Sequence, residues 1–185
     1  MISTGVMSKK IILLSGYAGS GKDTVGDILV KDYGYTRFAF ADRLKQYVST
    51  KYSINRELME TQEGKRSLVN TEGNSDKTLS VRDILIDEAA KSKRDYPNVW
   101  ADFLLDDISD SECDKIVVTD LRYPNEYSTI KKYYDDVTAC RIHNPNIEIL
   151  SDDSEHQMDS FTFDKVIYNT SDLSFLRESV KKLNL

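Results

Sequence analysis

The residues best suited to chemistry stand in the stretch GYAGSGKDT, from Gly16 to Thr24, directly after the apolar run KIILLS. Gly16, four spacers, Gly21 and Lys22 follow the pattern G-x-x-x-x-G-K, in which glycines let backbone N–H groups curl around phosphates. A helix that begins near Lys22 would direct the positive end of its dipole to the same place, and the lysine would bridge the outer phosphates. An apolar strand before the loop and a helix after it are the context this pattern requires, so we expect a nucleotide phosphate site.

The pattern departs from its usual form at Asp23. This residue replaces the hydroxyl side chain that normally contacts Mg²⁺, and the hydroxyl arrives one place later, at Thr24. A carboxylate beside a triphosphate repels it, and three arrangements would resolve this. In the first, Thr24 or a water takes the ligand position on Mg²⁺, and Asp23 orders that water. In the second, Asp23 binds Mg²⁺ directly. In the third, Asp23 faces a cationic group that neutralises its charge. A plain helix-start role also suits an acidic residue, but it leaves the metal short of a ligand.

A second constellation, VVTDLRYPNE, places Asp120 at the end of an apolar strand, where open α/β sheets bind ligands. Such an aspartate commonly supports Mg²⁺ in P-loop enzymes. The guanidinium of Arg122, two residues on, can contact a phosphate at two points, and the alternative is a surface ion pair with Glu126. Asn125 follows Pro124 and is a candidate cap for the next helix.

The elements that must position these residues alternate between strands and helices along the chain. Strands are predicted at residues 10–15, 37–41, 115–120, 137–142 and 165–169. Helices are predicted at residues 24–33, 42–52, 78–91, about 98–108, 125–134 and 172–182, with Ser80 and Asp172 as candidate N-caps. Because parallel strands need crossover connections, the economical fold is α/β, with helices on both faces of the sheet. Two long irregular stretches, residues 55–76 and 144–161, are candidate lids or binding loops.

Bulk composition limits the classes of protein that fit. The 185 residues, 39% hydrophobic and 30% charged, suit one domain with a sizeable core. A net charge of -6 and a pI near 5.0 argue against a general nucleic-acid binder. The two cysteines, Cys113 and Cys140, are too few for a disulfide framework and match no metal site. No apolar run approaches the roughly 20 residues of a membrane span, so we expect a cytoplasmic protein without nucleic-acid or membrane partners.

These segments resemble the deoxynucleoside monophosphate kinases of large DNA viruses and bacteriophages and, more distantly, animal-type phosphomevalonate kinases. GYAGSGKDT is similar to the family's GKDT loop, RFAFADRLK to its FA-x-x-LK segment, and VVTDLRYPNE to its TD-x-R-x-x-NE element. LSVRDILIDEAAKSKRDYPNVWADFL resembles its helical pair R-x-x-L…R…W, and DDSEHQMDSFTFDKVIYNTSDLSFL resembles its tail. In that family Asp replaces the usual Ser or Thr of the loop, so Asp23 looks like a family feature.

The resemblance implies an NMP-kinase-like three-layer fold with a mostly parallel five-stranded sheet, and the reaction dNMP + ATP → dNDP + ADP with Mg²⁺. It implies one kinase domain over residues 1–185, with its core at 9–52, 113–143 and 162–185. An acceptor-binding helical insert would occupy about 53–110 and a lid about 144–161. Monomer and homodimer are both compatible with it.

The resemblance also implies roles for individual residues. The ATP-binding residues would be Ala18, Gly19, Ser20, Gly21, Lys22, Asp23, Thr24 and Asn169, with Asn169 near the adenine. The substrate-binding residues would be Asp42, Lys45, Arg82, Trp100, Arg122, Arg141 and Glu155, with Trp100 as a wall of the base pocket. Catalysis would rest on Lys22, Asp23 and Arg122, and Mg²⁺ on Asp23, Thr24 and Asp120. A lone Trp on an amphipathic helix is as often a core residue, so both interpretations of Trp100 stay open.

Two other functions stay open at this point. The first is a kinase for another small phosphorylated metabolite such as phosphomevalonate. The aromatic residues Phe38, Phe40 and Trp100 favour a nucleotide base over an isoprenoid acid, but only weakly. The second is a nucleotide-binding switch that hydrolyses ATP and transfers nothing. The additional basic residues and the two lid-like stretches argue against such a switch.

Overall fold

The computed structural model describes residues 9–70, 78–148 and 156–183. The chain divides into two compact units, one formed by Phe40–Phe103 and the other by the parts before and after it. Each unit has its own sheet and its own hydrophobic cluster. Glu155, predicted to contact the acceptor, lies outside the described residues, as does the part of the predicted lid from 149 to 155.

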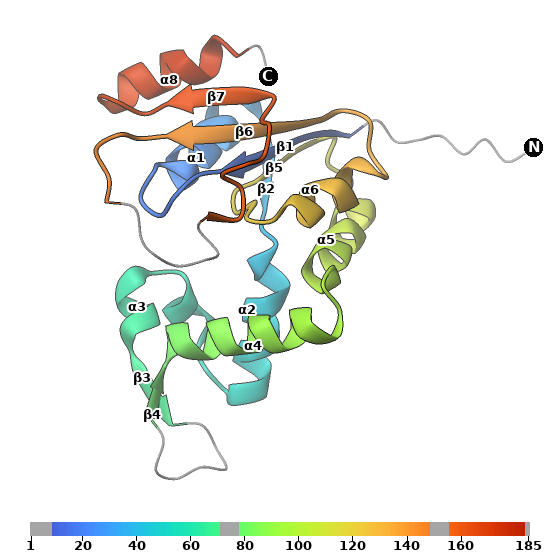
Figure 1. Cartoon of the computed structure of the whole chain (residues 1–185), viewed down its shortest axis with the longest axis vertical. Helices are drawn as coiled ribbons and strands as arrows, with labels where there is room; N and C mark the ends of the chain where they lie inside the picture. Colours follow the sequence, from blue (N-terminus) through green and yellow to red (C-terminus); the bar gives the residue numbers. More distant parts are fainter. Residues whose placement is uncertain (1–8, 71–77, 149–155, 184–185) are drawn as a thin grey trace, which may run out of the picture. The chain divides into compact units, whose positions relative to one another are not determined.

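The first unit is built on a parallel five-stranded sheet with the order β2-β5-β1-β6-β7 (Figure 1). The strands are β1 (Lys10–Ser15), β2 (Thr36–Phe38), β5 (Lys115–Val118), β6 (Val137–His143) and β7 (Lys165–Tyr168). All four neighbouring pairs run parallel, which confirms the predicted sheet. The predicted strand at 37–41 ends early, because Phe40 already has helical dihedral angles and α2 begins at Ala41.

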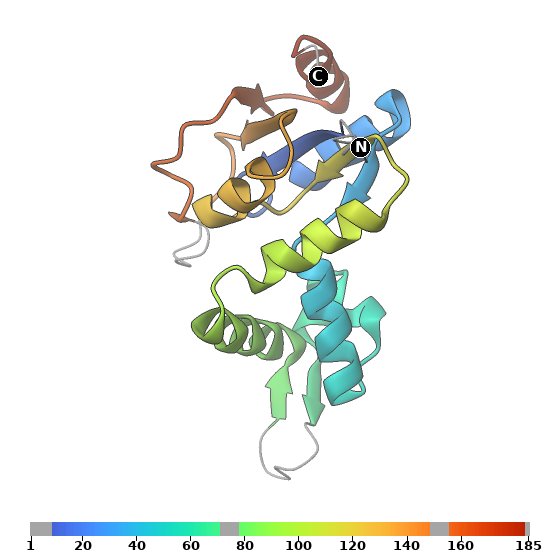
Figure 2. The ribbon, with the colours of Figure 1, turned by 90° about the vertical axis from the view of Figure 1, so that its right-hand side faces the viewer.

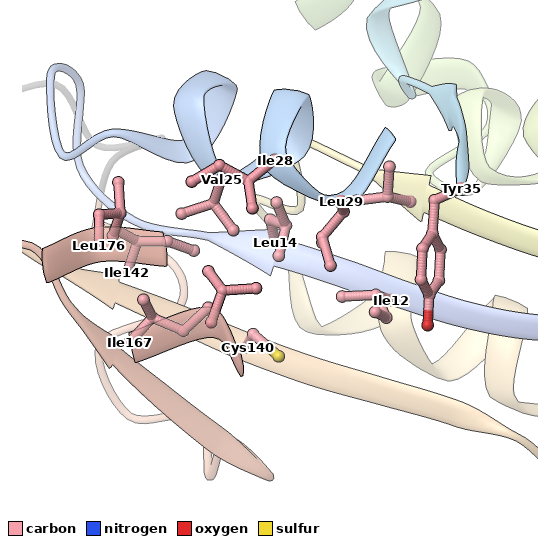
Figure 3. Packing of buried hydrophobic residues seen from close by; sticks show 12 residues of the cluster. Ile12, Leu14, Val25, Ile28, Leu29, Tyr35, Cys140, Ile142, Ile167 and Leu176 are labelled. Atoms are coloured by element: carbon pink, nitrogen blue, oxygen red, sulfur yellow. The ribbon is translucent and has the colours of Figure 1, made fainter. Parts of the chain in front are cut away.

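Helices cover both faces of this sheet (Figure 2). The helices α1 (Lys22–Tyr33) and α8 (Leu173–Lys181) cover one face, and α6 (Pro124–Lys131) packs on β6 from the other. In Figure 3, Leu14 of β1 lies against Val25 and Ile28 of α1, and Ile12 lies nearer to Leu29 and Tyr35. Ile11 and Leu13 are equally buried and, because successive side chains of a strand alternate, belong to the opposite face. A strand buried on both faces is apolar throughout, which explains the continuous run KIILLS.

The second unit holds most of the predicted helical insert and also α2. Its elements are α2 (Ala41–Tyr52), the 3-10 helix η1 (Arg56–Met59), α3 (Gln62–Arg66), β3 (Leu68–Asn70), β4 (Thr78–Ser80), α4 (Val81–Asp95) and the start of α5 (Val99–Asp110). The predicted helix at 78–91 begins three residues late, because 78–80 pair with β3 as an antiparallel strand. Ser80 is the N-cap of α4, as predicted, and its side chain accepts the N–H of Asp83.

Buried groups hold the second unit together. Its apolar cluster contains Leu44, Val48, Ile54, Met59, Val81, Ile84, Leu85 and Trp100. Glu88 of α4 is buried beside it and accepts hydrogen bonds from Lys51 Nζ at 2.8 Å and Tyr52 Oη at 2.9 Å. A buried carboxylate needs such partners, because an unpaired charge is costly to remove from water. Across the described parts of both units, no helix is long and apolar enough to cross a membrane.

Candidate active site

The loop between β1 and α1 has the geometry of a phosphate cradle. Its three glycines, Gly16, Gly19 and Gly21, have φ angles of 156°, 77° and 102°, and the N–H of Ser20 donates to the Tyr17 carbonyl at 3.0 Å. Gly21 is the N-cap of α1 and has no side chain with which to cap it. The positive end of a 12-residue helix is therefore left to an anion bound at the loop.

Asn169 holds this loop from the end of β7. Its Nδ2 donates to the Ser20 carbonyl at 2.9 Å, while its own N–H donates to the His143 carbonyl at 2.8 Å. A Cβ on Gly21 would lie 2.5 Å from Asn169 Nδ2, so a side chain at this positive-φ position would displace the asparagine. The structure thus places Asn169 against the loop, and its predicted contact with adenine stays a prediction.

Lys22 is folded back over its own loop. Its Nζ donates to the carbonyl of Gly16 at 2.6 Å and to that of Tyr17 at 2.9 Å. These carbonyls keep the ammonium within the loop, where it would meet the outer phosphates of a bound nucleotide. The Ser20 hydroxyl, in the same loop, is buried with no hydrogen-bond partner among the described residues. A buried hydroxyl without a partner is costly, and a phosphate oxygen could accept its proton.

Asp23 is neutralised by an arginine. Its carboxylate forms an ion pair with Arg37 of β2, whose guanidinium also reaches Asp27, one helical turn further on, at 3.4 Å. The Asp23 side chain is 81% exposed and the Arg37 side chain 38%, so the pair lies near the surface. Of the arrangements that would reconcile a carboxylate with a triphosphate, the structure contains the neutralising cation. Binding of Mg²⁺ by Asp23 stays a prediction.

Asp120 lies beside the loop because β5 and β1 are neighbours in the sheet. Pairing continues past Val118 and Leu13, since the N–H of Leu121 donates to the Leu14 carbonyl at 3.0 Å. Asp120 and the Thr24 hydroxyl supply oxygen ligands of the kind that Mg²⁺ prefers. Among the described residues no three His, Cys, Asp or Glu side chains gather into a metal site, so Mg²⁺ here would also need phosphate oxygens as ligands.

The backbone that carries Arg122 is fixed by Glu126. The Glu126 carboxylate is buried and accepts the N–H groups of Arg122 at 2.9 Å and Tyr123 at 3.1 Å. Glu126 is therefore not the surface residue that the ion-pair alternative assumed. The prediction that Asn125 caps the next helix is wrong, because α6 begins one residue earlier, after its N-cap Tyr123.

In the second unit, Asp42 and Lys45 belong to one network on α2. Arg56 joins them, since its Nη2 contacts Asp42 Oδ1 at 2.9 Å and its Nε contacts Glu60 Oε1 at 3.0 Å. Glu60 Oε2 in turn contacts Lys45 Nζ at 2.7 Å. Burial raises the pKa of Glu60, but the hydrogen bonds and charges of Lys45 and Arg56 outweigh it, so the pKa lies below its ordinary value. Arg56 and Glu60 were not predicted, because they lie in the irregular stretch 55–76 and belong to none of the motifs recognised in the sequence.

Two further predicted substrate residues also lie in the second unit. Arg82 donates to Gln62 Oε1 at 2.5 Å. Trp100 is 6% exposed and packs in the apolar cluster, and its indole N–H has no partner among the described residues. This burial favours the core interpretation of Trp100. A contact with the substrate base stays a prediction.

Comparisons with known proteins bear on this site. Residues 10–80 match the family model for deoxynucleotide monophosphate kinase, and the match contains the glycine loop, Asp23, Asp42 and Lys45. The family match and the P-loop fold together indicate an ATP-dependent deoxynucleotide monophosphate kinase.

Solved structures support the fold of this kinase. Dephospho-CoA kinase from Campylobacter jejuni aligns with a TM-score of 0.54 at 13% identity, over 96% of each chain. TT1252 from Thermus thermophilus aligns with a TM-score of 0.52 at 15% identity, over 95% of this chain and 96% of that one. At such low identity the likeness shows the fold alone. No curated protein matches the sequence.

Proposed function

We propose that this kinase moves the γ-phosphoryl group of ATP to a deoxynucleoside monophosphate and releases the diphosphate and ADP. The observation that supports this best is the geometry of the loop Gly16–Thr24. In this loop the Lys22 ammonium is held by loop carbonyls, and the Asp23 carboxylate forms an ion pair with Arg37. The family match over residues 10–80 supports the class of acceptor.

Phosphoryl transfer depends on positioning and charge neutralisation more than on covalent chemistry by the protein. In this proposal the loop N–H groups and the Ser20 hydroxyl bind phosphate oxygens, and Lys22 stabilises the charge on the transferred group. Thr24 and Asp120 would hold Mg²⁺, which neutralises phosphate charge when bound. Arg37 offsets the charge of Asp23, which would otherwise repel the triphosphate.

Arg122 would contact the acceptor phosphate or the transferred group. Its backbone is anchored by the buried Glu126, at the ligand-binding end of the sheet. Arg122→Lys should lower kcat/KM by about tenfold, because a point charge cannot reproduce a two-point contact. Arg177→Lys, at an exposed ion pair of α8, is the matched control. Unchanged kinetics in Arg122→Lys would leave Arg122 without this role.

The acceptor would be bound in part by the network on α2. Asp42 and Lys45 lie one turn apart on this helix and are held by Arg56 and Glu60. Fixed charged groups can recognise the hydroxyl and amide groups of a nucleotide with little loss of side-chain entropy. We further propose a cytoplasmic protein, monomeric or homodimeric, whose partner is a small-molecule nucleotide and not a nucleic acid.

The test is release of ADP from ATP and Mg²⁺ with a panel of acceptors: dGMP, dTMP, dCMP, dAMP, their ribose counterparts and phosphomevalonate. Fast turnover on deoxynucleotides and weak turnover on ribonucleotides is expected. Turnover only on phosphomevalonate would replace the substrate and keep the kinase. Slow ADP release that ignores every acceptor would indicate a switch and overturn the acceptor assignments.

A further inference from the structure

A cluster of side chains in the first unit joins the phosphate loop to the last residues of the predicted lid, 156–161. Asp159 lies at its centre. Its Oδ1 accepts hydrogen bonds from Tyr17 Oη at 2.8 Å and Arg141 Nη2 at 3.1 Å, and its Oδ2 lies 2.8 Å from His156 Nδ1. Burial raises the pKa of Asp159, but the hydrogen bonds from His156 and Tyr17 and the charge of Arg141 outweigh it and lower the pKa. The carboxylate is therefore ionised at neutral pH.

Arg141 is held on several sides in this cluster. Its guanidinium carbon lies 4.4 Å from the centre of the Tyr17 ring and 5.6 Å from that of Phe163, and its Nη1 donates to Ser15 Oγ at 3.3 Å. Its side chain is only 15% exposed. A guanidinium fixed by two rings, a hydroxyl and a carboxylate keeps few of its rotamers.

Tyr17 connects this cluster to the phosphate loop, because its backbone belongs to the loop and its side chain to the cluster. The carbonyl of Tyr17 accepts the N–H of Ser20 and the ammonium of Lys22, while its hydroxyl donates to Asp159. Arg141 is paired in register with Ser15, the residue directly before Gly16. The arginine and the lysine are therefore both positioned by the same short stretch of chain.

We propose that Asp159 is a positioning residue for ATP binding, which holds Tyr17 and the Arg141 guanidinium together at the start of the phosphate loop. In this proposal Arg141, which the resemblance assigned to the substrate, contacts the phosphates of ATP instead. Its guanidinium is already oriented before ATP arrives, so ATP binding does not have to order this long side chain. Avoiding that cost strengthens binding about three- to tenfold. The inference rests on ATP binding at the loop, which is part of the proposed function, but not on which acceptor is used.

A purely structural role for Asp159 makes a different prediction. If the carboxylate only attached its own segment, 156–161, to the sheet, its loss would lower the melting temperature without a selective effect on ATP. A positioning role raises the Kd and KM for ATP, and leaves kcat and the acceptor KM within about twofold, because the contact is made equally before and during transfer. The two roles are therefore separated by comparing the substrates.

The experiment compares wild type with Asp159→Ala, Tyr17→Phe and the double variant, using the Kd of a non-hydrolysable ATP analogue and steady-state kinetics. Asp159→Ala should raise the Kd and the KM for ATP about three- to tenfold. Tyr17→Phe keeps the ring over Arg141 and removes only the hydroxyl, so about a twofold rise is expected. The double variant should match Asp159→Ala, because the hydroxyl has then already lost this acceptor.

Asp32→Ala is the matched control, since Asp32 is an exposed carboxylate whose ion pair with Arg177 lies outside the cluster. It should bind the analogue like wild type. Any of three results would overturn the proposal. These are an unchanged affinity for the analogue in Asp159→Ala and Tyr17→Phe, equal rises in the KM for ATP and the KM for the acceptor, and additive effects in the double variant. If Asp159→Ala does not fold, Tyr17→Phe alone decides. A wild type that binds the analogue but phosphorylates no deoxynucleotide refutes only the acceptor, and one that binds no analogue refutes both.

Discussion

The ion pair between Asp23 and Arg37 predicts that loss of the arginine weakens ATP binding through the aspartate left behind. In Arg37→Met the carboxylate on the first turn of α1 loses this guanidinium while the triphosphate arrives nearby. With 81% of the Asp23 side chain exposed, the surroundings are close to water. Unit charges about 4 Å apart then interact by about 1 kcal/mol, and measured exposed pairs give about 0.2–1 kcal/mol. The upper value corresponds to about fivefold in Kd.

The assay is binding of a non-hydrolysable ATP analogue to Arg37→Met, Asp23→Asn and the double variant at two salt concentrations. Arg37→Met should bind up to about fivefold more weakly, with a smaller difference at high salt. Adding Asp23→Asn to Arg37→Met should restore the affinity for the analogue to within about twofold of wild type. Asp27→Asn removes the other carboxylate near Arg37 and is the internal control, which should restore nothing. Failure of Asp23→Asn to restore binding would refute the reasoning and make Arg37 a direct ligand of the nucleotide.

Three further perturbations have defined outcomes. Lys22→Ala should lower kcat at least about a hundredfold, because the ammonium stabilises the charge on the transferred phosphoryl group. ADP release measures kcat, and circular dichroism checks that the fold is retained. Glu88→Gln should destabilise the second unit by about 1–2 kcal/mol at pH 7, measured by urea unfolding. Burial raises the pKa of Glu88, but bonding to Lys51 outweighs it and lowers the pKa, so its stabilisation is present above 4.5 and fades as the pH falls through the lowered value. Gly64→Ala should cost about 1–3 kcal/mol, because its Cβ would lie 2.5 Å from the Leu58 carbonyl oxygen, measured by thermal unfolding.

Each of these variants has a control or a contradicting outcome. Lys31→Ala changes an exposed lysine of α1 and should keep full activity, so equal losses in both variants would contradict the role of Lys22. Asp87→Asn changes an exposed carboxylate next to Glu88 and should cost little. A Glu88→Gln variant whose stability deficit persists unchanged at pH 3 would contradict the pKa argument. A Gly64→Ala variant as stable as wild type would mean that Leu58 can move aside.

Local sequence signals predicted most of the elements but not all of their bounds. The apolar runs of β1 and β5 and the N-cap Ser80 correspond closely to the structure, because each depends on residues adjacent in the chain. Thr78–Ser80 form a strand where a helix was predicted, since they pair with β3, which local periodicity does not reveal. Trp100 shows the same limit, because burial depends on what the helix packs against.

The sequence by itself determined the phosphate loop of this protein. Glycine spacing, the following helix and Lys22 act within a few residues of one another, so their geometry follows from the local chain. Only the tertiary structure determined which side chains from distant parts of the sequence contact that loop. Arg37 lies 14 residues from Asp23, and Asp159 lies 142 residues from Tyr17. Such pairs meet because of strand order and register, and strand pairing is set by contacts between distant segments that no local pattern encodes.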